Sequence, residues 1–137
     1  MKVYNITFKG YRRDINAGSL PNYSGIYLVY RCNFNPETDK VSLVELFYIG
    51  KSKDINREIN QHNRHDEFLS QAKDGEEICY AYAQVDESTL DIVENALIYM
   101  QKPRLNLYLK DNFNHQPSEF HIDGSCALLF KVDFSIY

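Results

Sequence analysis

The chain has 137 residues, of which 44% are hydrophobic and 25% are charged, and this composition is typical of one soluble globular domain with a buried core. Its net charge of −4 excludes a protein that coats nucleic acid with a broadly basic surface, so any nucleic-acid contact would have to use a local patch. No apolar run reaches the ~20 residues that a membrane-spanning helix needs, and the N-terminus lacks the apolar core of a signal peptide. We therefore expect a cytoplasmic protein without membrane contact.

Three cysteines, Cys32, Cys79 and Cys126, are widely separated and odd in number. None has a neighbour at metal-ligand spacing, and a disulfide framework is not expected without a secretory signal. We interpret them as small buried hydrophobic side chains.

The first third of the chain reads as three strands. Residues 1–10 alternate like a strand, and residues 12–24 contain the glycine, proline, asparagine and serine of a loop. Two β-branched and aromatic runs follow, GIYLVYR (25–31) and VSLVELFYIG (41–50). Between them, NFNPETDK (33–40) has the composition of a long hairpin loop, so we expect the two runs to pair.

A basic helix is expected directly after the second of these strands. Asp54 is a suitable N-cap, and Ile55, Ile59 and His62 recur at the spacing of one helical face. A short second helix is expected over DEFLSQAK (66–73).

A third strand, EEICYAYAQV (76–85), and a second amphipathic helix come next. Ser88 followed by Asp91 three residues later resembles a capping box, and Pro103 ends the helix. The apolar stripe of this helix consists of Leu90, Val93, Leu97 and Ile98.

The C-terminal run CALLFKVDFSIY (126–137) reads as a final strand, which we expect to pair with residues 1–10. The whole pattern predicts an α+β fold: a single domain, residues 1–137, with a small central antiparallel sheet flanked by helices and extra strands at both ends.

Two tyrosines on neighbouring strands could carry chemistry. Tyr27 follows Gly25 by two residues and Tyr48 precedes Gly50 by two, and a glycine allows close approach of a ligand or of another backbone. If the strands pair, both phenols can meet on one face, although a cross-strand aromatic pair in the core explains the same pattern.

Charged residues on the two helices form a second group of candidates. Lys51 and Lys53 precede the first helix, whose N-terminus favours anions, but a solvated basic turn has the same composition. Glu94 lies at the border of the apolar stripe, where a carboxylate needs a divalent cation or a salt bridge as partner. The residues alone favour the salt bridge. Asn106 follows the helix end and could hold a loop through bonds to the backbone.

Taken together in this order, GIY, YIG, a helix carrying His62, Glu94 and a final Pro-x-x-Asn resemble the GIY-YIG endonuclease superfamily. The segment ENALIYMQKPRLNLYLKD (94–111) is similar to the catalytic N-terminal domain of the bacterial nucleotide-excision-repair incision subunit. The resemblance covers residues 24–111 and leaves both ends of the chain outside it.

The resemblance implies a nuclease that hydrolyses phosphodiesters of nucleic acid, with DNA as the expected substrate, using one Mg²⁺ or Mn²⁺ ion. Glu94 would hold the metal, Tyr27 would be the general base, and Tyr48 would orient it. Lys51 would contact the scissile phosphate and His62 would lie near it, whereas Gly25, Gly50 and Asn106 would have structural roles. Because a phenol has a pKa near 10, Tyr27 could act as a base only if nearby cations favoured its phenolate.

Two features depart from the family pattern. The interval between GIY and YIG holds 20 residues, which a longer hairpin loop can absorb. More seriously, Glu58 occupies the position where the family carries a phosphate-binding arginine, and loss of such a clamp costs about 3–4 kcal/mol. Arg57 could replace it by reaching inward. The alternative is a catalytically impaired domain that binds nucleic acid or a protein partner.

Overall fold

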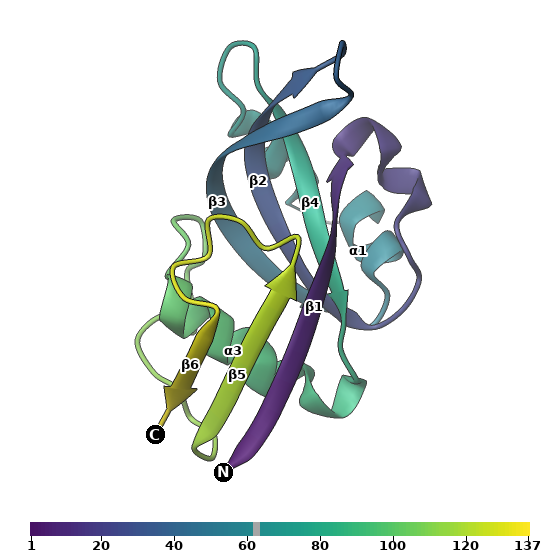
Figure 1. Ribbon diagram of the computed structural model, residues 1–137. Coiled ribbons are helices and arrows are strands. Elements are labelled where there is room, and N and C mark those ends of the chain that lie inside the picture. Colours follow the sequence, from purple (N-terminus) through teal and green to yellow (C-terminus); the bar gives the residue numbers. More distant parts are fainter. Residues whose placement is uncertain (62–63) are drawn as a thin grey trace.

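The computed structural model describes residues 1–61 and 64–137, and its main feature is one curled six-stranded sheet (Figure 1). The strand order is β3-β2-β4-β1-β5-β6, and all neighbours are antiparallel except β1 and β5, which run parallel. The strands are β1 (Lys2–Arg13), β2 (Gly25–Asn35), β3 (Lys40–Ser52), β4 (Glu77–Gln84), β5 (Ser118–Gly124) and β6 (Asp133–Ile136).

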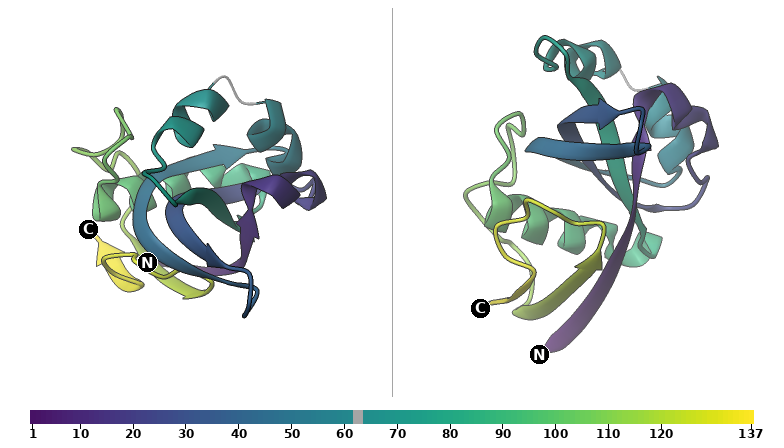
Figure 2. Two further views of the ribbon diagram at one scale, coloured as in Figure 1. Left: turned by 90° about the horizontal axis from the view of Figure 1, so that it is seen from above. Right: turned by 45° about the horizontal axis from the view of Figure 1, so that its top comes forward.

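Helices cover both faces of this sheet (Figure 2). The helical elements are η1 (Asp14–Ser19), α1 (Ile55–Gln61), α2 (His65–Ser70), η2 (Glu87–Thr89) and α3 (Leu90–Gln101). The longest of them, α3, lies on one face, and η1, α1 and α2 lie on the other. The sheet with helices on its two faces confirms the α+β class, although the sheet is larger and mixed instead of small and antiparallel.

Within residues 1–61 and 64–137, none of the helices has the length and apolar character required to cross a membrane.

Side-chain alternation along β2 divides the core into two clusters. Ile26, Leu28 and Tyr30 point toward α3, and the predicted apolar stripe of that helix is buried against them. Tyr27 and Val29 point to the opposite face, where they pack with apolar side chains of η1, α1 and α2. Because successive residues of a strand face opposite sides, Tyr27 lies on the α1 side of the sheet.

The connection between β2 and β3 differs from the expected long loop. Both strands continue beyond the apolar runs, and only residues 36–39 form the turn between them. Two register irregularities, at Val29/Tyr30 and at Arg31/Cys32, each leave one extra residue in β3. The 20-residue interval is thus absorbed mainly by strand.

The starts of α1 and α3 show one confirmed and one wrong prediction. Asp54 caps α1, because its carboxylate accepts the Arg57 backbone N–H at 3.1 Å. Ser88 does not cap α3, whose N-cap residue Thr89 makes no capping hydrogen bond through its side chain. Ser88 lies in η2, which Asp86 caps by accepting the Ser88 N–H at 2.8 Å. Asp91 therefore does not take part in a capping box.

The C-terminal prediction was also wrong. Only Asp133–Ile136 of the run 126–137 is a strand, and it pairs with β5 instead of β1. The parallel neighbour of β1 is β5, whose alternating buried residues Ser118, Phe120 and Ile122 are a strand signal that its turn-rich flanks obscured.

Candidate active site

The aromatic ring of Tyr27 lies directly over the backbone of Gly50. The register of the hairpin pairs these two residues, and a Cβ atom on Gly50 would lie 2.3 Å from Cζ of Tyr27. No side chain can occupy that space, so the glycine at the end of the strand is required by the phenol opposite it. The Tyr48 ring lies 6.2 Å from the Tyr27 ring at 35°, which brings both tyrosines to the same face of the hairpin.

The Tyr27 hydroxyl donates a hydrogen bond to the Glu58 carboxylate at 3.2 Å. Helix α1 places Glu58 there, because Ile55 and Ile59 on its buried side fix the rotation of the helix. Burial raises the pKa of Tyr27 well above its usual value, and the negative charges of Glu58 and Glu94 add to the rise. Tyr27 is therefore a neutral hydrogen-bond donor, and the surroundings oppose the phenolate that the family resemblance would require.

Glu94 extends from α3 to the edge of β3. Its side chain is 13% exposed, and its carboxylate lies 3.9 Å from the Lys51 ammonium. Burial raises the pKa of Glu94, and the negative charges of Asp91 and Glu58 raise it further, whereas Lys51 lowers it. The salt bridge favoured by the residues alone is present as a loose pair.

Lys51 makes its closer contact with Asp91, one turn before Glu94 on α3. This hydrogen bond is the main reason that the pKa of Lys51 is raised. Lys51 thus remains cationic at the site and is 41% exposed, so a phosphate group could reach its ammonium in exchange for Asp91.

A divalent cation suits this set of oxygen donors. Mg²⁺ is commonly held by one or two carboxylates together with water and substrate phosphates. Within the described ranges 1–61 and 64–137, no three His, Cys, Asp or Glu side chains are grouped to hold a metal by themselves. Glu94, as a mostly buried carboxylate whose nearest cation is 3.9 Å away, has the chemistry expected of a single protein ligand to Mg²⁺.

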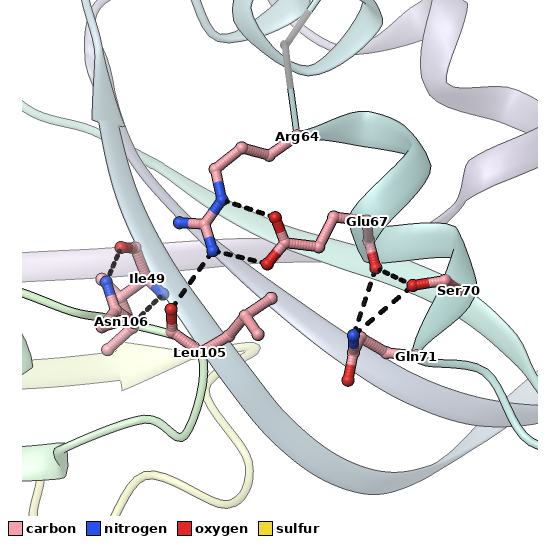
Figure 3. A network of polar contacts seen from close by, with 7 residues as sticks. All are labelled: Ile49, Arg64, Glu67, Ser70, Gln71, Leu105 and Asn106. Atoms are coloured by element: carbon pink, nitrogen blue, oxygen red, sulfur yellow. Dashed lines mark hydrogen bonds and ion pairs between the residues drawn. The ribbon is translucent and has the colours of Figure 1, made fainter.

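The second tyrosine, Tyr48, has a cation next to it. The Arg64 guanidinium lies 4.8 Å from the centre of the Tyr48 ring and lowers the pKa of its phenol, although burial outweighs it and the pKa is raised overall. Arg64 is held by a two-pronged ion pair with Glu67, at 2.8 and 3.2 Å, and by the Leu105 carbonyl (Figure 3).

Asn106 fastens the chain after α3 to the outer edge of β3 (Figure 3). Its amide donates to the Ile49 carbonyl at 2.9 Å, and its side-chain oxygen accepts the Ile49 N–H at 3.0 Å. One buried side chain therefore satisfies both backbone groups of an edge-strand residue next to Gly50. Gly25 serves packing at the other end of the hairpin, because a Cβ there would lie 1.9 Å from the Ala83 carbonyl oxygen.

Arg57, another candidate, lies at the start of α1. Arg57 is exposed and, with Lys53 and Glu58, contributes to the lining of a hollow of about 290 Å³ beside the start of α1. Glu58 is thus shared between this hollow and Tyr27. His62 lies outside the described residues.

The structure places Tyr27 and Tyr48 together on the α1 face of the hairpin, and Lys51 with Glu94 at the end of β3 next to α3. The charge of Glu94 raises the pKa of both phenols, so its electrostatic influence reaches from the second pair to the first. Sequence reasoning missed Asp91 and Arg64. The spacing of Asp91, one turn before Glu94, could have indicated the first; nothing local indicated the second, because its position depends on how α2 is placed.

In comparisons with known proteins, no protein-family model, no curated protein sequence and no solved structure matches this chain.

Proposed function

We propose that the protein is a GIY-YIG-type endonuclease that hydrolyses phosphodiesters of nucleic acid, with DNA as the expected substrate and Mg²⁺ as the cofactor. The hairpin of β2 and β3 would correspond to the paired GIY and YIG strands of that superfamily. The observation that supports the proposal is that Tyr27 and Tyr48 pack together over Gly50 while Lys51, the next residue along β3, pairs with Glu94 of α3. The charge of Glu94 raises the pKa of both phenols.

In the proposed reaction, Glu94 would hold the cation, and the cation would supply stabilisation of the negative charge on the leaving oxygen. Lys51 exchanges its contact with Asp91 for the scissile phosphate. Tyr48 packs beside Tyr27, with the ring centres 6.2 Å apart, and would orient it.

The hydrogen bond between Tyr27 and Glu58 changes how the water would be deprotonated. Tyr27 is neutral and its proton is already directed to Glu58. Because Tyr27 is fully buried, water would reach its oxygen once the contact between Tyr27 and Glu58 opens to solvent. As the water oxygen bonds to phosphorus and the bond from phosphorus to the leaving oxygen breaks, one water proton would pass to the Tyr27 oxygen and the Tyr27 proton would pass to Glu58, which becomes the carboxylic acid. Tyr27 ends neutral, and Glu58 is the final proton acceptor in this scheme.

A second candidate function is a domain of the same type that binds nucleic acid without cleaving it. It is favoured by the negative charge at Glu58, which would repel a phosphate at the position where the family carries a cation. A cytoplasmic location belongs to both proposals, and the three free thiols suit a reducing compartment.

Cleavage of supercoiled plasmid with Mg²⁺ or with EDTA distinguishes the two functions. The nuclease proposal predicts Mg²⁺-dependent nicking that falls roughly 100-fold or more in Glu94→Gln, because the metal supplies several kcal/mol of transition-state stabilisation. Tyr27→Phe and Glu58→Gln should each lower the rate without abolishing plasmid binding. Glu37→Gln, on the exposed hairpin turn, is the matched control.

The opposite pattern supports the binding domain. Wild-type protein would then retain plasmid without nicking it, and Glu58→Arg would strengthen binding or create cleavage. Nicking that is equal in wild-type protein, Glu94→Gln and Tyr27→Phe would refute the assigned roles.

A further inference from the structure

The loop that follows Asn106 exposes three large apolar side chains in succession. Leu107 is 74% exposed, Tyr108 is 79% exposed and Leu109 is 41% exposed. Single exposed apolar residues are common on protein surfaces, but a continuous run on one loop usually marks an interaction site.

This loop is fixed at both ends by neighbours of site residues. Asn106 bonds to Ile49, which precedes Gly50. At the other end, Asn95, which is buried and follows Glu94 on α3, donates to the carbonyls of Leu109 at 3.2 Å and of Asn112 at 2.8 Å. The loop therefore begins at the edge of the candidate active site and returns to the helix that carries its acid.

The backbone of the loop is held in an unusual conformation. Leu109 has a φ of 67°, which bulky side chains rarely adopt, and such a residue persists only where its surroundings impose it. Here the Asn95 amide holds the Leu109 carbonyl. The exposed tip is thus presented on a braced backbone, which lowers the entropic cost of using it for binding.

The charge of the segment indicates the kind of partner. Residues 102–110 contain Lys102, Arg104 and Lys110 and no acid, although the whole chain has a net charge of −4. Arg104 is paired with Glu45 of β3, the Lys102 ammonium contacts the Lys110 carbonyl, and Asp111 follows the segment directly. An exposed aromatic side chain with cationic residues on both sides of it along the chain is a combination that can bind unpaired nucleotides, by stacking on the base and neutralising the phosphates.

We propose that residues 102–110 form a contact loop for single-stranded nucleic acid, in which Tyr108 stacks on an unpaired base and Lys110 contacts a phosphate. The choice of nucleic acid as partner rests on the proposed function, and the inference adds which surface binds it and in which strand state. A nuclease with this loop would prefer a junction or a single-stranded region next to its cleavage site.

Fluorescence anisotropy with a labelled oligonucleotide tests this loop separately from hydrolysis. The full chain is titrated, in EDTA, into a 20-nucleotide single strand and into the duplex of the same sequence. Tyr108→Ala should weaken single-strand binding about 5- to 150-fold, because loss of one stacked base has this effect on affinity. Tyr108→Phe should retain most of the affinity, and Tyr137→Ala, another exposed tyrosine, is the matched control. Lys110→Gln should reduce the slope of log K against log salt by about 0.7.

The binding titration is carried out in EDTA and measures affinity without hydrolysis. A protein that fails to cleave plasmid can therefore still give the expected loss of affinity in Tyr108→Ala. Equal affinity of wild-type protein and Tyr108→Ala for the single strand would overturn the inference, as would failure of the wild-type protein to bind it. Concentration-dependent self-association that is lost in Tyr108→Ala, with unchanged oligonucleotide affinity, would show that the loop contacts a second copy of the chain instead.

Discussion

The hydroxyl of Tyr27 and the carboxylate of Glu58 are joined by a hydrogen bond of 3.2 Å, at the position where the resemblance leads one to expect a phosphate-binding arginine. The bond couples the proton of a buried phenol to an acid on the first helix. Its consequence is that the phenol is kept protonated, so the two residues have to be considered as one unit in any proposed chemistry.

We predict that Tyr27 does not titrate with ordinary tyrosines near a pKa of ~10. Its pKa is raised first by burial and then by the charges of Tyr48 and Glu58. In Glu58→Gln, the Tyr27 pKa should fall relative to wild-type protein but stay raised, because the burial is unchanged. Nuclear magnetic resonance of ¹³C-labelled tyrosine rings measures this, with Tyr27→Phe to assign the signal. A Tyr27 signal that titrates near 10 in the wild-type protein would show that the phenol is not in this environment.

The close packing of Tyr27 on Gly50 predicts that Gly50→Ala is destabilising. The added methyl group would overlap the phenol ring, and overpacking of this kind costs about 1–3 kcal/mol in the free energy of unfolding. Gly18→Ala is the control, because a Cβ there would meet no atom within 4 Å. Urea denaturation measures both variants, and equal stability of the two would contradict the observed ring position.

Asn106 should contribute more to stability than an average surface asparagine. Asn106→Ala removes two hydrogen bonds and leaves the Ile49 N–H and carbonyl without their partner, which should lower the free energy of unfolding by about 2–3 kcal/mol. Asn112→Ala, at an exposed position, should change it by less than about 0.5 kcal/mol. A small effect at Asn106 would mean that water replaces its bonds to β3.

The pairing of β5 with β6 should depend on pH through His121. Its ring contacts Glu119 and Asp133, both at 2.7 Å, and these hydrogen bonds raise the pKa of His121. Because the folded-state pKa lies above the unfolded value of about 6.5, the contribution to stability is fully present below that pH and is lost as pH rises through the folded-state pKa. Urea denaturation of wild-type protein and His121→Gln across this range should show a difference that decreases with rising pH. A pH-independent difference would contradict the ion pairs.

The first four strands along the chain and the apolar stripe of α3 were accessible from the sequence because they follow from side-chain periodicity. Leu90, Val93, Leu97 and Ile98 are all buried, and Ile55 and Ile59 face the core of the opposite cluster. The partner of the C-terminal strand was not accessible, since parallel pairing of β1 and β5 depends on tertiary arrangement.

Part of the candidate site could also be predicted from the alternation of side chains along the strands. Hairpin pairing could place Tyr27 near Gly50 and Tyr48, because register follows from strand alternation. The bond between Tyr27 and Glu58 was not accessible, because it requires the exact rotation of α1 over the sheet. The contact of Lys51 with Asp91 likewise requires knowledge of where α3 crosses β3.

Anomalous diffraction from crystals soaked in Mn²⁺ tests most directly whether the acid and the two phenols form one metal-dependent centre. We expect an anomalous peak within bonding distance of the Glu94 carboxylate, on the side facing Tyr27 and Tyr48, and its loss in Glu94→Gln crystals. A fully soaked crystal with Mn²⁺ only at other carboxylates, or a Glu94 side chain directed away from both phenols, would contradict the account.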